Sequence, residues 1–205
     1  MKYTGPKMKL CRREQSNLFG SSKYDIKKRK NTPWQHGASM KRHSEYGKLL
    51  RNKQMWKRTY LLSEKQFVRI IKDISATYSK NKGVSHDVAL FQFLERRLDS
   101  IVYRAGLAKT IMQARQMVNH GHLLLNGKKH NIPSTFVNPW DSIQVRKNLQ
   151  TSPLYTQAWS DNVKIPSWVK VSKKAFEIEV LDVPQVGEIA SSGDLLKVIE
   201  FYARA

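Results

Sequence analysis

The sequence predicts an α+β protein with a mainly helical first half, followed by two short helices and a small antiparallel sheet. Two patterns support this class. Apolar residues recur with helical spacing between residues 45 and 104. A glycine, a short apolar run and an Asn-Gly turn then follow one another within residues 121–127. At 205 residues, the chain has the length of two small domains.

Positive charge is concentrated near the amino terminus. The formal net charge is +21, and residues 1–60 hold 17 Lys and Arg against three acidic residues, a net charge of +14. Such an excess calls for a polyanion that offsets its self-repulsion, with nucleic acid as the first candidate and an anionic membrane as the second. No apolar run approaches the roughly 18 residues of a membrane span, so the membrane interpretation is the weaker one.

Residues 1–45 are interpreted as a basic arm. The basic run Lys27–Lys30 and five chain breakers interrupt any helical periodicity; the breakers are Gly5, Pro6, Gly20, Pro33 and Gly37. We expect this arm to be poorly ordered alone and to fold against an anion. A simply disordered tail is the alternative, and the aromatic residues Tyr3, Phe19 and Trp34 argue against it.

Three helices are predicted between residues 45 and 104. The first carries an apolar stripe made of Tyr46, Leu49, Leu50, Met55, Trp56 and Tyr60. The second follows the capping-box pair Ser63 and Gln66, and it buries Phe67, Ile70, Ile71 and Ile74. A loop at residues 79–85 separates it from a third helix over Val88–Arg104.

A fourth helix is predicted over residues 110–119. Thr110 and Gln113 have the spacing of another capping box, which marks where a helix begins. Gly121 suits the left-handed position that ends a helix, because glycine adopts positive φ without strain.

A hairpin is predicted directly after this helix. Leu123–Leu125 is a short apolar strand, and Asn126-Gly127 is the strongest short hairpin signal, because both central residues of a type I′ turn need positive φ. The run "DSIQVR" from Asp141 alternates like a further strand of the same sheet.

This helix–sheet unit is predicted to present one basic surface. Its members are Arg96, Arg97, Arg104, Lys109, Arg115, His120, His122, Lys128 and Lys129. Proteins contact A-form RNA through its phosphates, 2′-hydroxyls and shape, which suits donors spread over two helices and a hairpin. The alternative is that these charges are merely solvated. We expect replacement of Arg96, Arg97 and Arg115 by Ala to weaken RNA binding and to leave the fold intact.

The carboxyl-terminal residues are acidic instead. From Ala175 onward six acidic residues face two basic ones, a net charge of −4. The run "FEIEVLDV" alternates like a strand, and the apolar residues from Leu195 to Tyr202 can close the helical core. We expect part of the acidic surface to face a basic protein neighbour.

Cysteine and histidine usage argue against a disulfide or a metal site. Cys11 is the single cysteine, so we expect a reducing compartment; the amino terminus lacks the apolar core of a secretory signal. His120 and His122 could meet on one face, but no cysteine partner or second close pair accompanies them. We predict no metal, no cofactor and no catalytic residue.

The segment "LERRLDSIVYRAGLAKTIMQARQMVNHGHLLLNGKKHNIPS" closely resembles the S-four family of small-subunit ribosomal proteins. Six further segments occur in the family's order, namely "YTGPKMKLCRRE", "PWQHG", "SEYGKLLRNKQ", "SEKQF", "PSWVKV" and "VIEFYARA". The resemblance implies an arm at 1–45 and a helical domain at 46–94 completed by 158–205. It also implies that an S-four-type RNA-binding domain is inserted between them at 95–157.

The same resemblance implies a structural constituent of the small ribosomal subunit. It predicts direct, early binding to 16S-type rRNA near a multi-helix junction of the 5′ domain, which nucleates assembly. It places the chain beside small-subunit neighbours that include the S-five family, near messenger RNA at its entrance, where the family contributes to translational accuracy. We expect no membrane and no homo-oligomer, in a cytoplasmic ribosome or in that of an organelle matrix or stroma.

The predicted RNA-binding residues combine the basic surface with the matching family segments. They are Lys7, Arg12, Arg13, Gln35, His36, Lys41, Arg42, Tyr46, Arg51, Lys53, Gln54, Arg96, Arg97, Arg104, Lys109, Gln113, Arg115, Gln116, His120, His122, Lys128 and Lys129.

The chain departs from the family in several places, and one small departure is Ser100 in place of the common Asn. Zinc-binding members carry several cysteines in the arm, whereas only Cys11 is present here. Trp34 and Trp140 stand where the family usually has glycine in a turn. Because tryptophan adopts positive φ with difficulty, we expect both turns to be reshaped.

Two other functions are weaker interpretations. The tripeptide Arg97–Asp99 matches the catalytic "RLD" of pseudouridine synthases, but it lies inside a helical stripe, and Asp99 is better explained as a helix-surface partner of a nearby arginine. A free-standing RNA chaperone or stress protein would explain the charge, but it would not explain the ordered matches outside residues 95–157.

Overall fold

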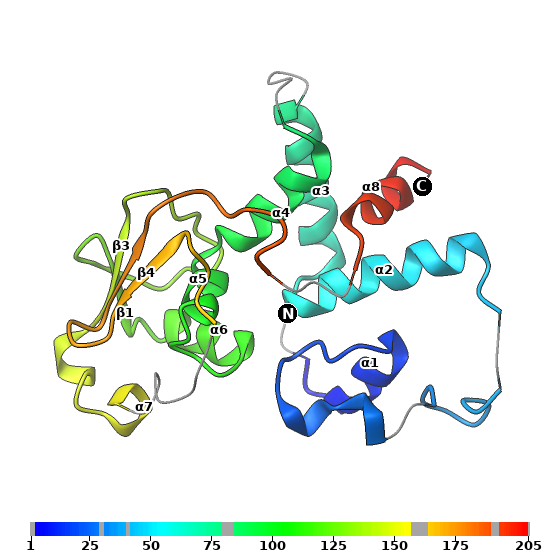
Figure 1. The fold of residues 1–205 in the computed structure, drawn as a ribbon, viewed down its shortest axis with the longest axis horizontal. Helices are drawn as coiled ribbons and strands as arrows, with labels where there is room; N and C mark the ends of the chain where they lie inside the picture. Colours follow the sequence, from blue (N-terminus) through cyan, green and yellow to red (C-terminus); the bar gives the residue numbers. More distant parts are fainter. Residues whose placement is uncertain are drawn as a thin grey trace. The chain divides into compact units, whose positions relative to one another are not determined.

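The computed structural model describes residues 3–28, 31–39, 42–78, 84–156, 164–189 and 193–204 (Figure 1). The chain forms two units, Met1–Leu90 with Ala190–Ala205, and Phe91–Ile189. The first is helical, and the second combines helices with a five-stranded sheet. The predicted α+β class is therefore confirmed. Lys41, residues 29–30 of the basic run and residues 79–83 of the predicted loop lie outside the described residues.

Polar side chains cap the starts of three helices of the first unit, with Asp194 as the cap of the last one. Its elements are α1 (Lys7–Glu14), η1 (Ser22–Tyr24), η2 (Ile26–Lys28), α2 (Glu45–Thr59), α3 (Glu64–Tyr78) and α8 (Leu195–Ala203). The Ser44 hydroxyl accepts a hydrogen bond from the Gly47 amide at 3.2 Å at the start of α2. Ser63 and Gln66 form the predicted capping box, with amide-to-side-chain bonds of 3.1 and 3.3 Å.

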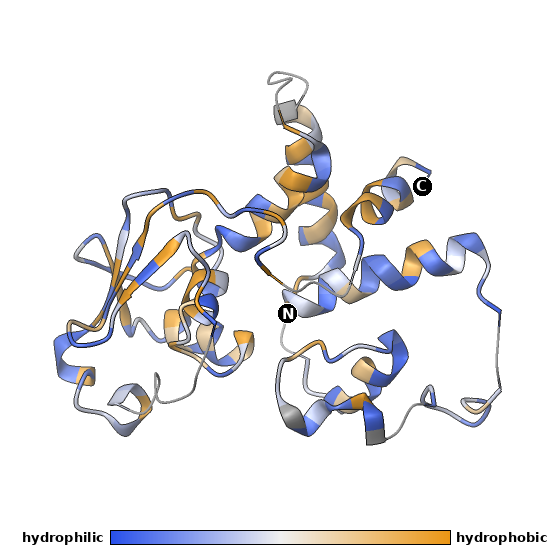
Figure 2. Cartoon of the chain, in the orientation of Figure 1, coloured by the Kyte–Doolittle hydropathy of each residue, from blue (hydrophilic) through white to orange (hydrophobic). Residues whose placement is uncertain are grey.

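The core of the first unit joins helices that are distant in sequence. Both α1 and α8 pack against α2. Buried side chains include Leu49, Trp56, Tyr60, Phe67, Ile70, Ile74, Val198 and Phe201. Hydrophobic residues recur along α3 and α8 in Figure 2. The carboxyl-terminal helix therefore closes the helical core, as the sequence predicts.

The second unit packs two helices on one face of its sheet (Figure 1). Its elements are the end of α4 (His86–Glu95), α5 (Leu98–Arg104), α6 (Ile111–Asn119), β1 (Leu123–Leu125), β2 (Lys128–His130), β3 (Ser142–Val145), η3 (Lys147–Leu149), α7 (Pro153–Thr156), β4 (Val169–Ser172) and β5 (Glu177–Val180). The strand order is β2-β1-β3-β5-β4, and every neighbouring pair is antiparallel. Leu98 and Val118 from the helices share one buried cluster with Leu123 and Ile143 from the strands.

The local signals around α6 and the hairpin are confirmed. The Thr110 hydroxyl accepts a hydrogen bond from the Gln113 amide at 3.2 Å and caps α6. Gly121 has φ of 64°, and the central turn residues Asn126 and Gly127 have φ of 50° and 77°. Both turns therefore use the left-handed conformations that their residue types favour.

The predicted single helix over Val88–Arg104 is two helices instead. Arg97 has an extended backbone between α4 and α5, with φ of −68° and ψ of 140°. The Leu98 amide donates to the Thr135 carbonyl at 2.9 Å, and the Val137 amide donates to the Arg96 carbonyl at 2.9 Å. These long-range backbone hydrogen bonds replace helical ones and interrupt the helix.

The segment 164–189 differs from the predicted domain boundary. The sequence placed all of 158–205 in the helical domain, but β4 and β5 extend the sheet of the second unit. Ile143 of β3 faces Ile178 of β5 in register, and Trp168 is buried in the same core. The alternating run near residue 178 needed a sheet partner, and pairing with β3 supplies it. Of the described carboxyl-terminal residues, only 193–204 belong to the helical unit.

The two tryptophan turns keep the left-handed conformation, contrary to expectation. Trp34 has φ of 83° and Trp140 has φ of 72°. The Gly37 amide donates to the Trp34 carbonyl at 3.0 Å, and the Asn138 amide donates to the Asp141 carboxylate at 2.7 Å. These hydrogen bonds hold each turn closed against a backbone strain of about 1–2 kcal/mol.

No helix among the described residues is both long enough and apolar enough to span a membrane.

Candidate nucleic-acid interface

Two arginines of the predicted surface hold a buried carboxylate. Both oxygens of Asp99 accept hydrogen bonds from Arg97 at 3.1 Å, and Arg115 donates to Asp99 Oδ2 at 2.9 and 2.6 Å. Asp99 is 0% exposed and Arg97 is 6% exposed. Asp99 does pair with arginine as predicted, but inside the unit rather than on a helix surface. The expectation that Arg97 and Arg115 can be removed without harm to the fold is therefore wrong, because Asp99 would remain buried without a counter-charge.

Arg104 has a similar internal role. It contacts the buried Glu95 carboxylate through Nε at 3.0 Å and through its terminal nitrogen at 2.7 Å. Arg104 and Arg115 keep about a fifth of their side-chain surface exposed. Each can therefore touch a ligand only at its edge, while most of its charge is neutralised by a carboxylate.

Arg96 stabilises the turn that carries Trp140. Its guanidinium donates to the Val137 carbonyl at 3.3 Å and to the Asn138 side chain. The Asn126 side chain, from the turn between β1 and β2, donates to Asp141 of this turn at 2.8 Å. Arg96 thus combines a structural role with partial exposure.

Four cationic or titratable side chains surround the glycine turn after α6. We call His120, His122, Lys129 and Arg146 the Gly121 cation cluster. Arg146 donates to the Gly121 carbonyl at 3.5 Å, and its backbone amide donates to the His122 carbonyl at 3.0 Å. A Cβ atom on Gly121 would lie 2.6 Å from Lys129 Cε, and the two histidine rings lie 5.7 Å apart. The turn, β2 and the end of β3 therefore bring the cluster together.

Burial lowers the pKa of His122, and electrostatic interaction with His120 and Arg146 lowers it further. Its Nδ1 lies 2.7 Å from the hydroxyl of Tyr155, whose pKa is raised to about 12 by burial. A neutral imidazole and a neutral phenol therefore share this hydrogen bond near pH 7. Tyr155 fixes the ring of His122 at the edge of the cluster.

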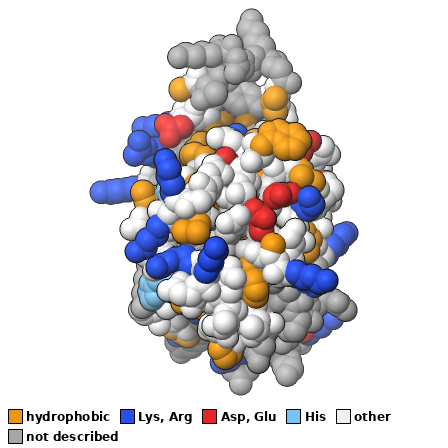
Figure 3. Space-filling model, turned by 90° about the vertical axis from the view of Figure 1, so that its left-hand side faces the viewer, with side chains coloured by type: hydrophobic (Ala, Val, Ile, Leu, Met, Phe, Trp, Pro, Cys, Tyr) orange, Lys and Arg blue, Asp and Glu red, His pale blue; other side chains and the backbone are white. Residues whose placement is uncertain are grey.

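The hairpin and the start of α6 add further exposed groups. Lys128 lies beside the cluster on β2, and both it and Lys129 are exposed. On the face drawn in Figure 3, Lys and Arg side chains lie along both edges, with a histidine on the left-hand edge. Lys109 and Gln116 are exposed as well, whereas the Gln113 side chain accepts a hydrogen bond from the Lys109 amide at 2.9 Å.

Two arginines of α1 hold the loop at residues 31–39. Arg12 donates to the carbonyls of Asn31 and Thr32 at 2.8 and 3.1 Å. The Arg13 guanidinium lies 5.0 Å from the centre of the Trp34 ring, within the range of a cation–π contact. The arm is therefore a folded part of the first unit over these described residues.

Two predicted residues of α2 are used inside the helical unit. Arg51 donates to Glu14 at 3.0 Å, and Arg58 binds the same carboxylate. Lys53 is 6% exposed; its ammonium contacts Glu64 at 2.7 Å and lies 4.3 Å from the centre of the Phe201 ring. The structure therefore gives Lys53 a core position rather than a surface one.

The other predicted residues of the first unit lie nearer the surface. Gln35, His36, Arg42 and Tyr46 are exposed, Lys7 and Gln54 are partly buried, and Lys41 lies outside the described residues.

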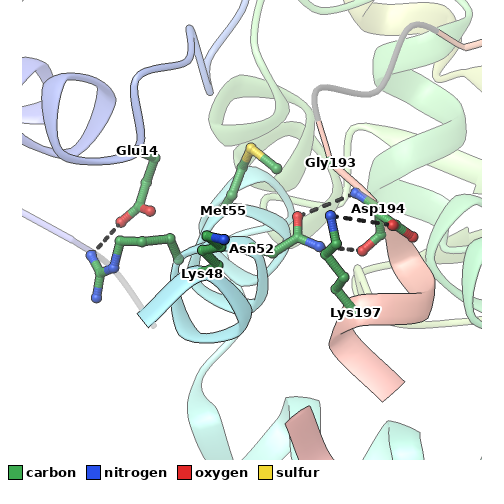
Figure 4. Close-up of a pocket in the computed structure, with 8 residues that line it drawn as sticks. Glu14, Lys48, Asn52, Met55, Gly193, Asp194 and Lys197 are labelled. Atoms are coloured by element: carbon green, nitrogen blue, oxygen red, sulfur yellow. Dashed lines mark hydrogen bonds and ion pairs between the residues drawn. The ribbon is translucent and has the colours of Figure 1, made fainter. Parts of the chain in front are cut away.

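A pocket of about 520 Å³ lies beside α2 in the first unit (Figure 4). Its lining residues are Glu14, Lys48, Arg51, Asn52, Met55, Gly193, Asp194 and Lys197. The Asn52 side chain accepts from the Asp194 amide at 3.2 Å and donates to the Asp194 carbonyl. Lys48, Arg51 and Lys197 each pair with a carboxylate. The Asn52–Asp194 hydrogen bonds beside the pocket therefore join α2 to the start of α8. The charged side chains among the described lining residues already pair with opposite charges.

Within the described parts of the chain, no group of three or more His, Cys, Asp or Glu residues could hold a metal. Cys11 is buried, and burial raises the pKa of its thiol. This thiol therefore resists ionisation and packs as a small apolar side chain.

Comparison with known proteins defines the class first and then the family. Residues 2–95 match the family described as "Ribosomal protein S4/S9 N-terminal domain", and residues 96–143 match the "S4 domain". These matches define a ribosomal protein, which confirms that the chain is not an enzyme.

Full-length relatives give the family directly. The small ribosomal subunit protein uS4 of Thermoanaerobacter sp. (strain X514) is 38% identical over 209 residues, covering 99% of each chain. The uS4A protein of Symbiobacterium thermophilum is 39% identical over 210 residues, again covering 99% of each. The uS4 protein of Persephonella marina is 40% identical over 208 residues and 98% of each. The chain therefore belongs to the uS4 family of small ribosomal subunit proteins, as its resemblance to the S-four family predicted.

Sequence reasoning missed Arg146 and Tyr155 as members of the site. Arg146 ends the predicted strand from Asp141, but only the β1–β3 register, with Leu123 opposite Val145, brings it beside Gly121. Tyr155 reaches His122 from α7, which carried no strong signal in the sequence.

Proposed function

We propose that this chain binds small-subunit ribosomal RNA directly, as a structural constituent that joins the rRNA early at a multi-helix junction of the 5′ domain. The observation that supports the proposal is the Gly121 cation cluster, which gathers side chains from three segments around one left-handed turn. Family membership supplies the ribosomal context.

The geometry of the cluster suits a folded RNA. The registers of β1 with β2 and with β3 fix the backbone positions of Lys129 and Arg146, and Tyr155 holds the ring of His122, so the cluster is partly organised before binding and less conformational entropy is lost. Lysine, arginine and histidine donors match phosphate oxygens, and a rigid set of donors selects RNA by the spacing of its phosphates. Selectivity then comes from shape rather than from reading base sequence.

The arm supplies a second contact region. Exposed Gln35, His36 and Arg42 lie in or next to the loop that α1 holds in place. The neutralisation of rRNA phosphates by both regions releases counterions, so binding weakens with salt by a log-log slope of about 0.7–0.9 per phosphate.

Protein neighbours are the second part of the proposal. A basic small-subunit protein, of which the S-five family is the candidate, contacts the acidic carboxyl-terminal surface near the messenger RNA entrance, where translational accuracy is influenced. Several acidic groups there already have partners within the unit, since Glu179 pairs with Lys170 at 2.9 Å and Glu188 accepts two hydrogen bonds from Ser167. Cross-linking in assembled subunits should join residues 177–194 to a protein, and cross-links to RNA alone would contradict this part.

The experiment that tests the rRNA proposal is a binding titration across a salt series. The purified chain is titrated with the 5′ domain of small-subunit rRNA, with transfer RNA and duplex DNA as competitors. Tight binding that survives both competitors at near-physiological salt is expected. Equal affinity for all three nucleic acids would contradict the proposal and would favour a free-standing RNA chaperone.

A further inference from the structure

The indole of Trp34 is held outward in a conformation that favours glycine. Trp34 has φ of 83° and is 65% exposed. A tryptophan in the left-handed region carries a backbone strain that glycine would avoid. Burial in the core cannot offset this strain, because most of the ring faces solvent.

The loop around Trp34 is firmly built. The Gly37 amide donates to the Trp34 carbonyl at 3.0 Å, and the Thr32 hydroxyl donates to the Gly37 carbonyl at 3.2 Å. A Cβ atom on Gly37 would collide with the Thr32 carbonyl. Arg12 fixes the start of the loop from α1. The loop therefore sets the direction of the indole before any ligand binds.

An arginine lies beside this ring in a basic part of the chain. The Arg13 guanidinium lies 5.0 Å from the ring centre, Arg12 lies on the same helix, and residues 1–60 have a net charge of +14. An exposed aromatic ring beside arginines can stack on a base while the cations meet the adjoining phosphates. A polyanion with flat apolar faces fits these two properties together.

We propose that Trp34 is a stacking platform for an unpaired nucleobase of RNA, with Arg13 beside it to neutralise the flanking phosphate. The inference rests on the proposed RNA binding by the arm. The nucleobase covers the exposed indole and offsets the strain at φ of 83°. Every base has a flat π face, so the platform accepts any of the four bases.

Trp140 offers a matched control. It is 83% exposed with φ of 72°, so it shares both unusual features with Trp34. Its turn is closed by the Asp141 carboxylate, and Asp182 follows shortly after Val180, whose carbonyl bonds to the Trp140 amide at 2.7 Å. The turn also carries the Arg96 guanidinium, which is bound to the Val137 carbonyl and the Asn138 side chain, and the Asp141 carboxylate offsets this charge, so Trp140 is not assigned a nucleobase.

The test uses the full chain and two single-stranded probes. One is an oligoadenylate of about 12 nucleotides, a length within the range of known single-strand sites. The other is an oligomer of the same length and charge that lacks bases. Trp34→Leu should lower the affinity for oligoadenylate about tenfold and leave the affinity for the abasic oligomer unchanged. Trp34→Tyr should retain most of the affinity, and Trp140→Leu should change neither.

The results distinguish a contribution of base stacking to affinity from a contribution of charge. They also test the stacking platform separately from the proposed function. Unchanged oligoadenylate affinity in Trp34→Leu would overturn the platform, as would an equal loss on the abasic oligomer. Thermal unfolding of each variant shows that the fold is kept, which the exposure of Trp34 leads us to expect. Failure of the wild-type chain to select the rRNA 5′ domain would count against the proposed function alone, because the oligoadenylate comparison does not depend on that target.

Discussion

Two groups of basic residues in the second unit look alike in sequence and differ in structure. Arg97, Arg104 and Arg115 of the α5–α6 region bind the buried carboxylates of Asp99 and Glu95. The Gly121 cation cluster and its neighbour Lys128 instead surround a glycine turn and a hairpin, where both lysines are exposed. The first group stabilises the unit, and the second is available to a ligand.

The difference shows that a count of positive charges overestimates a binding surface. A buried carboxylate needs a counter-charge, and arginine can provide it with two parallel hydrogen bonds. The first unit repeats the pattern, since Glu14 binds Arg51 and Arg58. Arginines near a helical core are thus partly structural, whereas lysines on a hairpin are mainly exposed.

The largest expected effect is the loss of the buried Asp99 charge. Asp99→Asn leaves Arg97 and Arg115 with an uncompensated positive charge inside the unit, and it should lower the free energy of unfolding by about 3–5 kcal/mol. Urea denaturation measures this change. The control Asp73→Asn removes a carboxylate that is 52% exposed and 3.8 Å from Arg69, so it should cost less than about 0.5 kcal/mol. Similar losses in the two variants would remove the distinction between buried and exposed pairs.

Removal of the cations around Gly121 and on the hairpin should instead weaken RNA binding more than it lowers stability. The triple variant Lys128→Gln, Lys129→Gln and Arg146→Gln should weaken rRNA binding by about 2–3 kcal/mol, because three solvent-screened ion pairs of up to about 1 kcal/mol each are lost. The log-log salt slope should become shallower by about 2–3, and the free energy of unfolding should stay nearly constant.

A variant with the same loss of charge provides the control for that triple change. Lys65→Gln, Arg69→Gln and Lys72→Gln alter exposed positions of α3. Filter binding across a salt series should show a much smaller loss for this set. If both triple variants lost equal affinity, net charge rather than the cluster would explain binding.

Two glycine substitutions test how the turn places Lys129. Gly121→Ala and Gly127→Ala both put a side chain at positive φ, so each should cost about 1–2 kcal/mol of stability. Only the Cβ atom at position 121 would displace Lys129, because nothing lies within 4 Å of a Cβ atom at position 127. Gly121→Ala should therefore also reduce rRNA affinity, measured by titration, while Gly127→Ala should not. Equal affinities would show that the position of Lys129 is unimportant.

The smallest expected effect concerns a carboxylate that is only half buried. Burial opposes ionisation of Glu64, but hydrogen bonds from Lys53, Lys57 and Tyr202 outweigh it and lower its pKa to about 2, from an ordinary 4.5. Because the folded pKa is the lower one, its contribution to stability is present above pH 4.5 and is lost as the pH falls toward 2.

Glu64→Gln tests this contribution. The side chain is 43% exposed, so solvent screening limits the expected loss at pH 7 to about 1 kcal/mol. Urea denaturation should show this difference in the free energy of unfolding between wild type and variant at pH 7 and a smaller difference at pH 3. A difference that does not depend on pH would assign the effect to packing instead of charge.

Much of the Gly121 cation cluster was predictable because its signals are local. The residue types predict positive φ at Gly121, Asn126 and Gly127, and the structure has it at all three. The predicted hairpin places Lys128 and Lys129 together. Arg146 and Tyr155 were not predictable, since they reach the same place through strand register and through α7. The internal ion pairs of Arg97 and Lys53 were not predictable either, because they depend on which segments pack together and become buried.

The order of residues determined the α+β class, the capped starts of α3 and α6, the hairpin and the family of this protein. Each of these depends on neighbours within a few positions or on the pattern of the whole chain. The tertiary structure decided that β4 and β5 extend the sheet, that the helix breaks at Arg97, and that Trp34 and Trp140 adopt positive φ. These outcomes depend on hydrogen bonds and packing between segments distant in sequence, whose free energies outweigh local conformational preference.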